Sequence, residues 1–271
     1  MEAYLDANRA HWDERADIHA EDLTGAYAIE RFLAGEDVLF PIEVAEIGDV
    51  AGLTALHLQC HIGIDTLCLA RRGARVTGLD FSDSALKHAR DLAAQAKLEA
   101  RFVLGDVYDA PALVGGGFDL VYTTWGTITW LPDIHRWGAA IAAVLKPGGR
   151  LYFADTHPAI APLEEIDGRL IPTFNWRTPS SLPLAFTVSQ TYTGDPRPLL
   201  NTQNFEWLHP VGDILMALID NGLVIERIAE HETLPYGLFP MMKVGEDRLY
   251  RLPAGMPRLP LSLSISAVKR G

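Results

Sequence analysis

Basic side chains are scarce in this sequence of 271 residues. It has 23 lysines and arginines against 35 aspartates and glutamates, which gives a formal net charge of −12 with histidine neutral. Binding to nucleic acid without sequence preference requires clustered lysine and arginine that displace phosphate counterions. Docking to an anionic membrane surface requires a similar positive patch. The charge therefore argues against both, and we expect a small molecule as the partner.

Cysteine is almost absent, and long apolar runs are missing. Cys60 and Cys68 are too few for a disulfide framework or a four-cysteine zinc site, so no metal site is predicted. No stretch approaches the roughly 18–20 apolar residues of a membrane helix. The first residues lack the basic and then apolar pattern of a secretion signal. We therefore expect a soluble, cytoplasmic protein that is a monomer or a homodimer.

Short apolar runs alternate with amphipathic segments of helical length from residue 53 onward. The predicted strands are Leu53–Leu58, Arg75–Phe81, Ala100–Leu104, Phe118–Thr123 and Arg150–Ala154. The predicted helices are Asp65–Arg72, Ser82–Ala96 and Ile134–Leu145. Strands that alternate with helices favour right-handed βαβ crossovers. The pattern predicts an α/β protein with a Rossmann-like, mostly parallel sheet and helices on both faces.

The flanking segments differ from this core in composition. The first fifty residues favour helices, whereas a later segment is rich in proline and aromatic residues and contains one stretch of period 2, Ala185–Tyr192. A helix over Val211–Asn221 and strands over Leu223–Ala229 and Leu261–Val268 follow. We divide the chain into an N-terminal helical cap (1–50), a Rossmann-like core (51–156), a β-rich aromatic insert (157–209) and a part that completes the sheet (210–271).

The turn after the first predicted strand is the most informative segment. It contains Gly63 and opens a helix, whose N-terminus favours a polar or anionic ligand. Asp80 and Asp106 end the next two predicted strands. Because ligands of open α/β sheets lie outside the carboxyl ends of the strands, these acids describe a groove for a nucleoside. Asp80 is placed to accept both ribose hydroxyls, and Asp106 to accept the amino group of adenine.

A dinucleotide is the obvious competing ligand, and the spacing of glycines argues against it. A dinucleotide-binding turn needs small residues at positions i, i+2 and i+5. The equivalent residues here are Gln59, His61 and Ile64, and none of them is glycine. NAD and FAD are therefore not expected.

Five motifs in sequence order resemble those of class I S-adenosylmethionine-dependent methyltransferases. They are Leu56-His57-Leu58-Gln59-Cys60-His61-Ile62-Gly63, Gly78-Leu79-Asp80-Phe81-Ser82, Gly105-Asp106-Val107, Phe118-Asp119-Leu120-Val121-Tyr122 and Leu145-Lys146-Pro147-Gly148-Gly149-Arg150-Leu151. The first motif departs from the family pattern, because His57 replaces an acid and Gln59 and His61 replace glycines. Its Leu-Gln-Cys-His-x-Gly-x-Asp-Thr form is similar to a bacterial subgroup of small-molecule methyltransferases.

The resemblance implies a seven-stranded sheet whose last strand is antiparallel. It also implies S-adenosylmethionine as the cofactor and transfer of a methyl group to oxygen, nitrogen or sulfur of a small molecule. The residues that it places at the cofactor are Trp12, Arg15, Gln59, Cys60, His61, Gly63, Asp80, Phe81, Ser82, Asp106, Val107, Thr124, Trp125 and Gly126. The resemblance implies that Trp12 and Arg15 lie on an N-terminal helix that folds over the donor, and that Arg15 pairs with the carboxylate of the donor.

The residues expected at the acceptor site are a histidine and several aromatic residues. His157 follows the fifth predicted strand and is expected to face the crevice as a base or orienting residue. Six rings of the insert are candidates to cover the acceptor: Phe174, Trp176, Phe186, Tyr192, Phe205 and Trp207. The predicted substrate pocket consists of Tyr27, Trp176, Tyr192 and Trp207.

Two alternatives remain open at the level of the sequence. Some proteins of this fold cyclise or cleave S-adenosylmethionine and release methylthioadenosine, for example in forming azetidine-2-carboxylate. The altered first motif keeps this possibility, because such enzymes differ at the methionine end. The second alternative is a non-catalytic module that binds S-adenosylmethionine.

Overall fold

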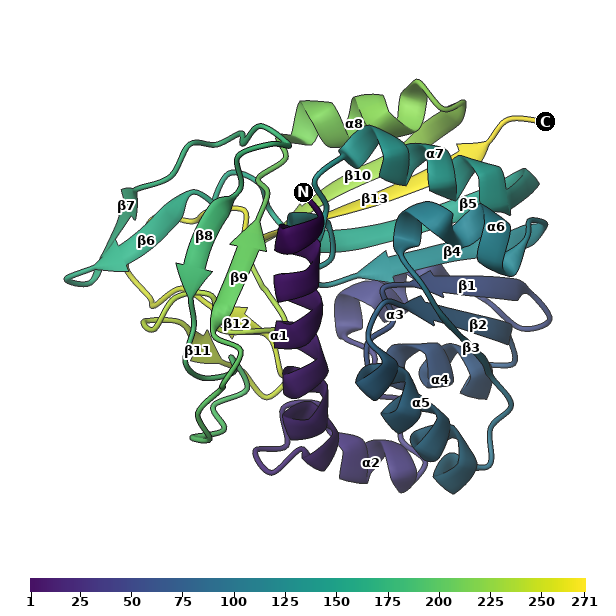
Figure 1. Cartoon of the computed structure of the whole chain (residues 1–271), viewed down its shortest axis with the longest axis horizontal. Coiled ribbons are helices and arrows are strands. Elements are labelled where there is room, and N and C mark those ends of the chain that lie inside the picture. Colours follow the sequence, from purple (N-terminus) through teal and green to yellow (C-terminus); the bar gives the residue numbers. More distant parts are fainter.

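A computed structural model describes residues 1–271, and its centre is one seven-stranded sheet (Figure 1). The strand order is β10-β13-β5-β4-β1-β2-β3. β13 runs antiparallel to both of its neighbours, and the pairs among β1 to β5 are parallel. The strands are β1 (Thr54–Leu58), β2 (Arg75–Asp80), β3 (Arg101–Leu104), β4 (Phe118–Thr124), β5 (Leu145–Thr156), β10 (Leu223–His231) and β13 (Ser262–Lys269). The predicted fold class is confirmed.

Helices cover both faces of the sheet. They are α1 (Glu2–Glu21), α2 (Ile29–Leu33), α3 (Pro41–Ile47), α4 (Ile64–Arg71), α5 (Asp83–Ala96), α6 (Ala110–Val114), α7 (Ile134–Val144) and α8 (Val211–Ile219), with 3₁₀ turns over Val107–Asp109 and Ile128–Trp130. Ser82 starts α5 as predicted, because its hydroxyl accepts from the N–H of Ala85 at 3.0 Å. No helix is both long and apolar enough to cross a membrane.

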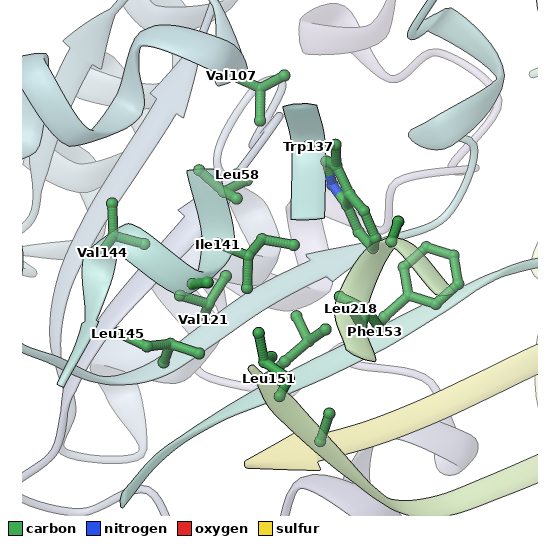
Figure 2. Packing of buried hydrophobic residues seen from close by; sticks show 14 of the residues in the cluster. Leu58, Val107, Val121, Trp137, Ile141, Val144, Leu145, Leu151, Phe153 and Leu218 are labelled. Atoms are coloured by element: carbon green, nitrogen blue, oxygen red, sulfur yellow. The ribbon is translucent and has the colours of Figure 1, made fainter. Parts of the chain in front are cut away.

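Two buried apolar clusters fill the spaces between the helices and the sheet. One cluster of 24 residues lies under α7 and α8, and a second one of 23 residues lies under α3, α4 and α5. Figure 2 shows the first cluster, in which Trp137 of α7 meets Phe153 of β5 edge to face. Gly138 allows α7 to approach α8 closely, since a Cβ there would lie 2.2 Å from the Ala217 carbonyl oxygen.

Three short hairpins lie outside the sheet. They are β6–β7 (Leu163–Ile166 and Arg169–Pro172), β8–β9 (Leu184–Thr187 and Gln203–Glu206) and β11–β12 (Lys243–Val244 and Tyr250–Arg251). The predicted strand 185–192 ends early, because the chain leaves β8 at Thr187. Residues 232–260 leave the sheet between β10 and β13 and contain β11–β12. We call α1 with residues 157–209 and 232–260 the roof; α1 runs between the hairpins and the sheet (Figure 1).

Candidate functional site

A cavity of about 720 Å³ lies at the carboxyl ends of the central strands, beneath the roof. Its floor comes from the segments that follow β1, β2, β4 and β5. Strand order reverses between β1 and β4, which are neighbours although β2 and β3 come between them in the chain. Such a reversal leaves a crevice at the carboxyl ends of an open α/β sheet, and the sequence predicted a site there.

The turn after β1 forms the centre of the floor. Gln59 and His61 have positive φ values of 57° and 49°, a conformation that side chains rarely adopt outside glycine. The backbone N–H of His61 donates to Asp80 Oδ2 at 2.8 Å, which holds this turn in place. Gly63 begins α4 with φ 76°, and a Cβ there would lie 2.8 Å from Cβ of Ala89. Gln59, His61, Gly63 and Asp80 line the cavity, as does Cys60.

Asp80 occupies the end of β2 with its carboxylate buried in the floor. Its Oδ1 accepts from the N–H of Ser82 at 2.9 Å, and its Oδ2 accepts from His61. Burial raises the pKa of Asp80 to about 6, although these two bonds oppose the shift. A carboxylate has about four lone-pair positions, so the two bonds leave Asp80 able to accept from a ligand.

Asp106 lies beside a second, much smaller cavity of about 30 Å³. Its Oδ1 accepts from the N–H of Tyr108 at 2.9 Å, and Val107 lines the same space. Four residues line both cavities, which makes the small one a side lobe of the large one: Gln59, Asp80, Phe81 and Trp130. Leu5, Asn8 and Arg9 of α1 close the lobe, leaving about the volume of one liquid water molecule.

The helix α1 brings Trp12 and Arg15 to the cavity. The Arg15 guanidinium lies 5.2 Å from the ring centroid of Trp12 and 5.7 Å from that of Tyr192. It is buried and forms no ion pair, and burial lowers the pKa of Arg15. A buried cation without a carboxylate partner is costly, so Arg15 suits an anionic ligand group.

Several buried polar atoms at the cavity have no hydrogen-bond partner within the chain. They are Trp12 Nε1, Arg15 Nε, Gln59 Oε1, Thr124 Oγ1, Trp125 Nε1 and Asn204 Oδ1. Buried polar groups are nearly always paired, and each exception requires an explanation. Both donors and acceptors are present, which fits a polar ligand in this cavity.

The segment after β4 forms the next part of the wall. Thr124, Trp125 and Gly126 all line the cavity, and Trp125 has a positive φ of 59°. Asp155 of β5 holds this segment, because its carboxylate accepts from the N–H groups of Gly126 at 2.6 Å and Thr127 at 2.8 Å. The sequence pattern did not single out Asp155, although it immediately follows a predicted strand.

The expectation that His157 faces the cavity is wrong. Its imidazole is buried away from the cavity, with Nε2 3.0 Å from Glu230 Oε1 of β10. Nδ1 accepts from the N–H of Ala159 at 3.0 Å. Successive residues of an extended chain point to opposite sides, so the neighbouring Thr156 and Pro158 line the cavity instead.

Trp176 does not belong to the cavity either. Its side chain is 59% exposed and is stacked against Arg177 on the outer surface. Tyr27, Tyr192 and Trp207 do line the cavity, as predicted for the substrate pocket. Of the other insert rings, Phe174 packs on Phe186, and Phe205 packs on Tyr4. Ser82 also lies outside the cavity lining, where its hydroxyl donates to Asp13 at 2.5 Å.

Some lining residues were missed by the sequence analysis. Tyr236 and Arg248 come from residues 232–260, which carry neither a motif nor a regular period, and Phe40 comes from the start of α3. The Arg248 guanidinium lies 4.8 Å from the ring centroid of Phe40. His19 lies on the same helix as Trp12 and Arg15 but was left out of the predicted site residues; it does not line the cavity, yet it reaches His61 with 2.8 Å between Nδ1 and Nε2. The i, i+4 and i, i+7 spacing of His19 with Arg15 and Trp12 was the available signal.

Comparison with known proteins gives a consistent result for the core. Residues 55–149 match the family described as a methyltransferase domain. A ubiquinone biosynthesis O-methyltransferase of Cronobacter sakazakii is 34% identical over 107 residues, which are 40% of this chain and 44% of that enzyme. One from Coxiella burnetii is 32% identical over 103 residues, or 38% and 43% of the two chains. The matched segment thus spans less than half of these enzymes.

Solved structures agree over a larger part of the chain. An S-adenosylmethionine-dependent methyltransferase from Mesorhizobium loti has a TM-score of 0.58 at 22% identity, over 88% of this chain and all of that one. A putative one from Listeria monocytogenes has a TM-score of 0.55 at 18% identity, over 84% and 95%. At these identities the likeness establishes the fold. The chain thus has the fold of these S-adenosylmethionine-dependent methyltransferases, and its residues 55–149 are similar to a methyltransferase domain.

Proposed function

We propose that the protein transfers a methyl group from S-adenosylmethionine to a small-molecule acceptor, with a hydroxyl as the accepting group. The observation that carries this is the cavity of about 720 Å³ at the carboxyl ends of the strands, with its side lobe between Asp80 and Asp106. One part of this space matches a nucleoside, and the rest extends under the roof, where an acceptor fits.

The donor is assigned to the floor of the cavity. Asp80 accepts from the ribose hydroxyls, and Asp106 in the side lobe accepts from the adenine amino group. The methionine end follows the turn from Gln59 to Gly63. Its carboxylate pairs with Arg15, which has no acidic partner of its own.

The acceptor is assigned to the space beneath the roof. Tyr27, Tyr192 and Trp207 give it aromatic walls, and Tyr236 adds a hydroxyl. A planar ring suits such walls. The matching ubiquinone biosynthesis enzymes are O-methyltransferases by name, which favours oxygen as the accepting atom.

The contribution of the chain to this reaction is mainly positioning. When bound, S-adenosylmethionine supplies an electrophilic methyl group on a positively charged sulfur. The floor residues hold the donor while the roof holds the acceptor, and this arrangement replaces an encounter of two molecules by a single oriented complex. Because the roof covers the carboxyl ends of the strands, it also keeps water from the reacting groups.

The first experiment is titration calorimetry of the whole chain with S-adenosylhomocysteine. We expect saturable binding of one molecule per chain, and no binding at millimolar concentration by the folded protein would contradict the proposal. Incubation with S-adenosylmethionine alone then tests the chemistry. Release of methylthioadenosine without an acceptor would replace methyl transfer by cleavage of the donor. Binding without transfer to any molecule of a cell extract would indicate a non-catalytic module.

A further inference from the structure

Two histidines from distant parts of the chain meet at the cavity wall. His19 comes from the last turn of α1, and His61 comes from the turn after β1. His19 Nδ1 lies 2.8 Å from His61 Nε2, and His19 Nε2 lies 2.5 Å from Thr191 Oγ1. The Tyr27 hydroxyl is 3.1 Å from the same Nδ1 of His19 and contacts the hydroxyl of Tyr192. These contacts form one hydrogen-bonded chain from His61 into the roof.

We propose that His61 removes the proton of a hydroxyl acceptor through its Nδ1, and that His19 orients His61 from behind. The inference deepens the proposed function and rests on it. His61 lines the cavity, and Nδ1 is the ring nitrogen that the contact with His19 leaves free. His61 is therefore the catalytic residue of the pair, and His19 is a positioning residue.

The contacts allow an arrangement of the protons that leaves Nδ1 of His61 unprotonated. In a neutral imidazole one nitrogen donates and the other accepts. If His19 donates from Nε2 to the Thr191 hydroxyl, its Nδ1 must accept from the Nε2–H of His61. Nδ1 of His61 then carries a lone pair. An acceptor that holds one N–H of a catalytic histidine, and so leaves a lone pair on the other ring nitrogen, is a recurring arrangement in enzymes.

Both imidazoles are neutral at ordinary pH and can accept a proton, although a lowered pKa also makes each a weaker base. Burial lowers the pKa of His61 to about 3, and the Arg15 charge adds to this shift. Burial, His61 and Arg15 lower the pKa of His19 well below its usual value. A carboxylate bound to Arg15 offsets the charge that both histidines face. The base would thus become stronger when the donor is present.

The proposed step is balanced in atoms and charge. The acceptor oxygen forms a bond to the methyl carbon while the bond from that carbon to sulfur breaks, and its electron pair stays on sulfur. The acceptor proton moves to Nδ1 of His61, and the Nε2 proton of His61 is shared with or passed to Nδ1 of His19. One positive charge leaves the sulfur and one appears on the histidine pair, so no other reactant is needed.

The protonation pattern is tested first, because this test needs no acceptor. The full chain is labelled with ¹⁵N-histidine and saturated with S-adenosylhomocysteine, and the imidazole nitrogens are followed by NMR. His61→Gln and His19→Gln assign the signals. We expect His61 to carry its proton on Nε2 and a lone pair on Nδ1. A proton on Nδ1 of His61 would overturn the proposal whatever the activity.

The second test compares two acceptors that differ in their need for a base. Catechol is protonated near neutral pH, whereas benzenethiol is largely ionised. With labelled S-adenosylmethionine, we expect His61→Gln to lower kcat for catechol by about 100-fold and to leave transfer to benzenethiol within about threefold. An equal loss with both acceptors would overturn the role as a base. If the wild-type chain methylates neither probe, the NMR result decides.

His19 offers a matched pair of variants. The amide oxygen of His19→Gln can still accept from His61, whereas His19→Leu cannot. We expect His19→Leu to lower kcat for catechol about tenfold without a change in KM, the value of one hydrogen bond to a charged group. His19→Gln should restore most of this loss. Equal loss in both variants would reduce His19 to a packing role and would contradict the orientation of His61.

Binding of S-adenosylhomocysteine separates this inference from the proposed function. His19→Leu should bind it within about threefold of the wild-type chain, with an unchanged circular dichroism spectrum. Failure of the wild-type chain to bind it refutes the proposed function. Binding by the wild-type chain together with a proton on Nδ1 refutes only the role of His61. His61→Asn provides a second variant if His61→Gln does not fold.

Discussion

The sheet and the roof are built from different interactions, although both line the same cavity. The sheet and its helices bury two apolar clusters of 24 and 23 residues, whereas the third cluster, in the roof, has five. Within the roof, α1 is instead joined to residues 200–205 by side chains that bond to backbone. Asn8 pairs with both backbone groups of Phe205 at 2.7 and 2.8 Å, and Glu14 accepts from the N–H groups of Leu200 and Asn201 at 2.7 Å.

This difference predicts that the sheet is the more stable region and that the roof rearranges more easily. Apolar burial is worth far more in total than a few hydrogen bonds, so the strand ends that position Asp80 and Asp106 keep their places. Regions with few buried apolar contacts open at low cost. The roof can therefore rearrange while the strand ends beneath it stay in place.

The largest expected effect is in the sheet. Leu56 of β1 is completely buried, and Leu56→Ala should lower the free energy of unfolding by about 2–5 kcal/mol through lost burial and a residual cavity. Urea denaturation measures this loss. Leu200→Ala in the roof is the control, because that side chain is 87% exposed. A loss below about 1 kcal/mol for Leu56→Ala would contradict the described core.

The next effect concerns the donor. Asp80→Ala should weaken binding of S-adenosylhomocysteine by about 1–3 kcal/mol, because the ribose hydroxyls lose their acceptor. Calorimetry compares it with Asp83→Ala, an exposed acid at the start of α5 that should bind as the wild-type chain does. Unchanged affinity in Asp80→Ala would remove Asp80 from the donor site.

The pH dependence of binding should follow the ionisation of Asp80. Its pKa is raised by burial from 3.8 to about 6, so protonation is favoured in the folded state. The stability from this group is present below pH 3.8 and is lost as pH rises through 6. Ligand binding depends on pH in the opposite sense, because the ionised carboxylate is the better hydrogen-bond acceptor. The affinity for S-adenosylhomocysteine should therefore fall below pH 6 by at most about tenfold per pH unit. Asp80→Asn should flatten this profile in calorimetry at several pH values.

A smaller effect is expected at the attachment of α1. Asn8→Ala removes two hydrogen bonds to Phe205 and should make β9 open more readily by about 1–2 kcal/mol. Hydrogen exchange of β9 should accelerate while exchange in β1 and β4 stays unchanged. Glu2→Ala, exposed on the same helix, is the control. Faster exchange throughout the sheet would show that the roof and the sheet are not separate in stability.

The smallest effect is expected at Trp176. Because this ring is on the outer surface, Trp176→Ala should change donor binding and stability by less than about 0.5 kcal/mol. Trp207→Ala is the matched variant in the same insert, since Trp207 is buried, lines the cavity and donates to the Ser180 carbonyl oxygen at 2.9 Å. Equal effects of the two substitutions would contradict the different placement of these rings.

The sheet could be predicted from the sequence because its signals are local. Alternation of apolar runs with helices located β1 to β5, and Asp80 and Asp106 could be placed because strand ends meet at one edge. The same reasoning failed for His157, which was expected to face the cavity. A residue just beyond a strand can face either side, and the sequence does not say which.

The roof could be predicted only in outline. Its aromatic content was visible, but Trp176 and Trp207 look alike in the sequence, and tertiary packing decides which one is buried. Tyr236 and Arg248 reach the cavity from an irregular segment, where no periodicity indicates which side chains point inward. The contact between His19 and His61 joins residues far apart in sequence, so it depends on how α1 crosses the sheet.

The tight side lobe beside Asp106 has a consequence for the order of events. A purine ring is larger than this lobe, so the proposed binding of adenine beside Asp106 would require α1 to tilt outward. Asn8 and Glu14 hydrogen-bond that helix to residues 200–205. The same tilt would therefore also move this segment of the roof, which covers the proposed acceptor site. Both parts of the cavity would thus open together, and S-adenosylhomocysteine and the methylated product would leave by the same route.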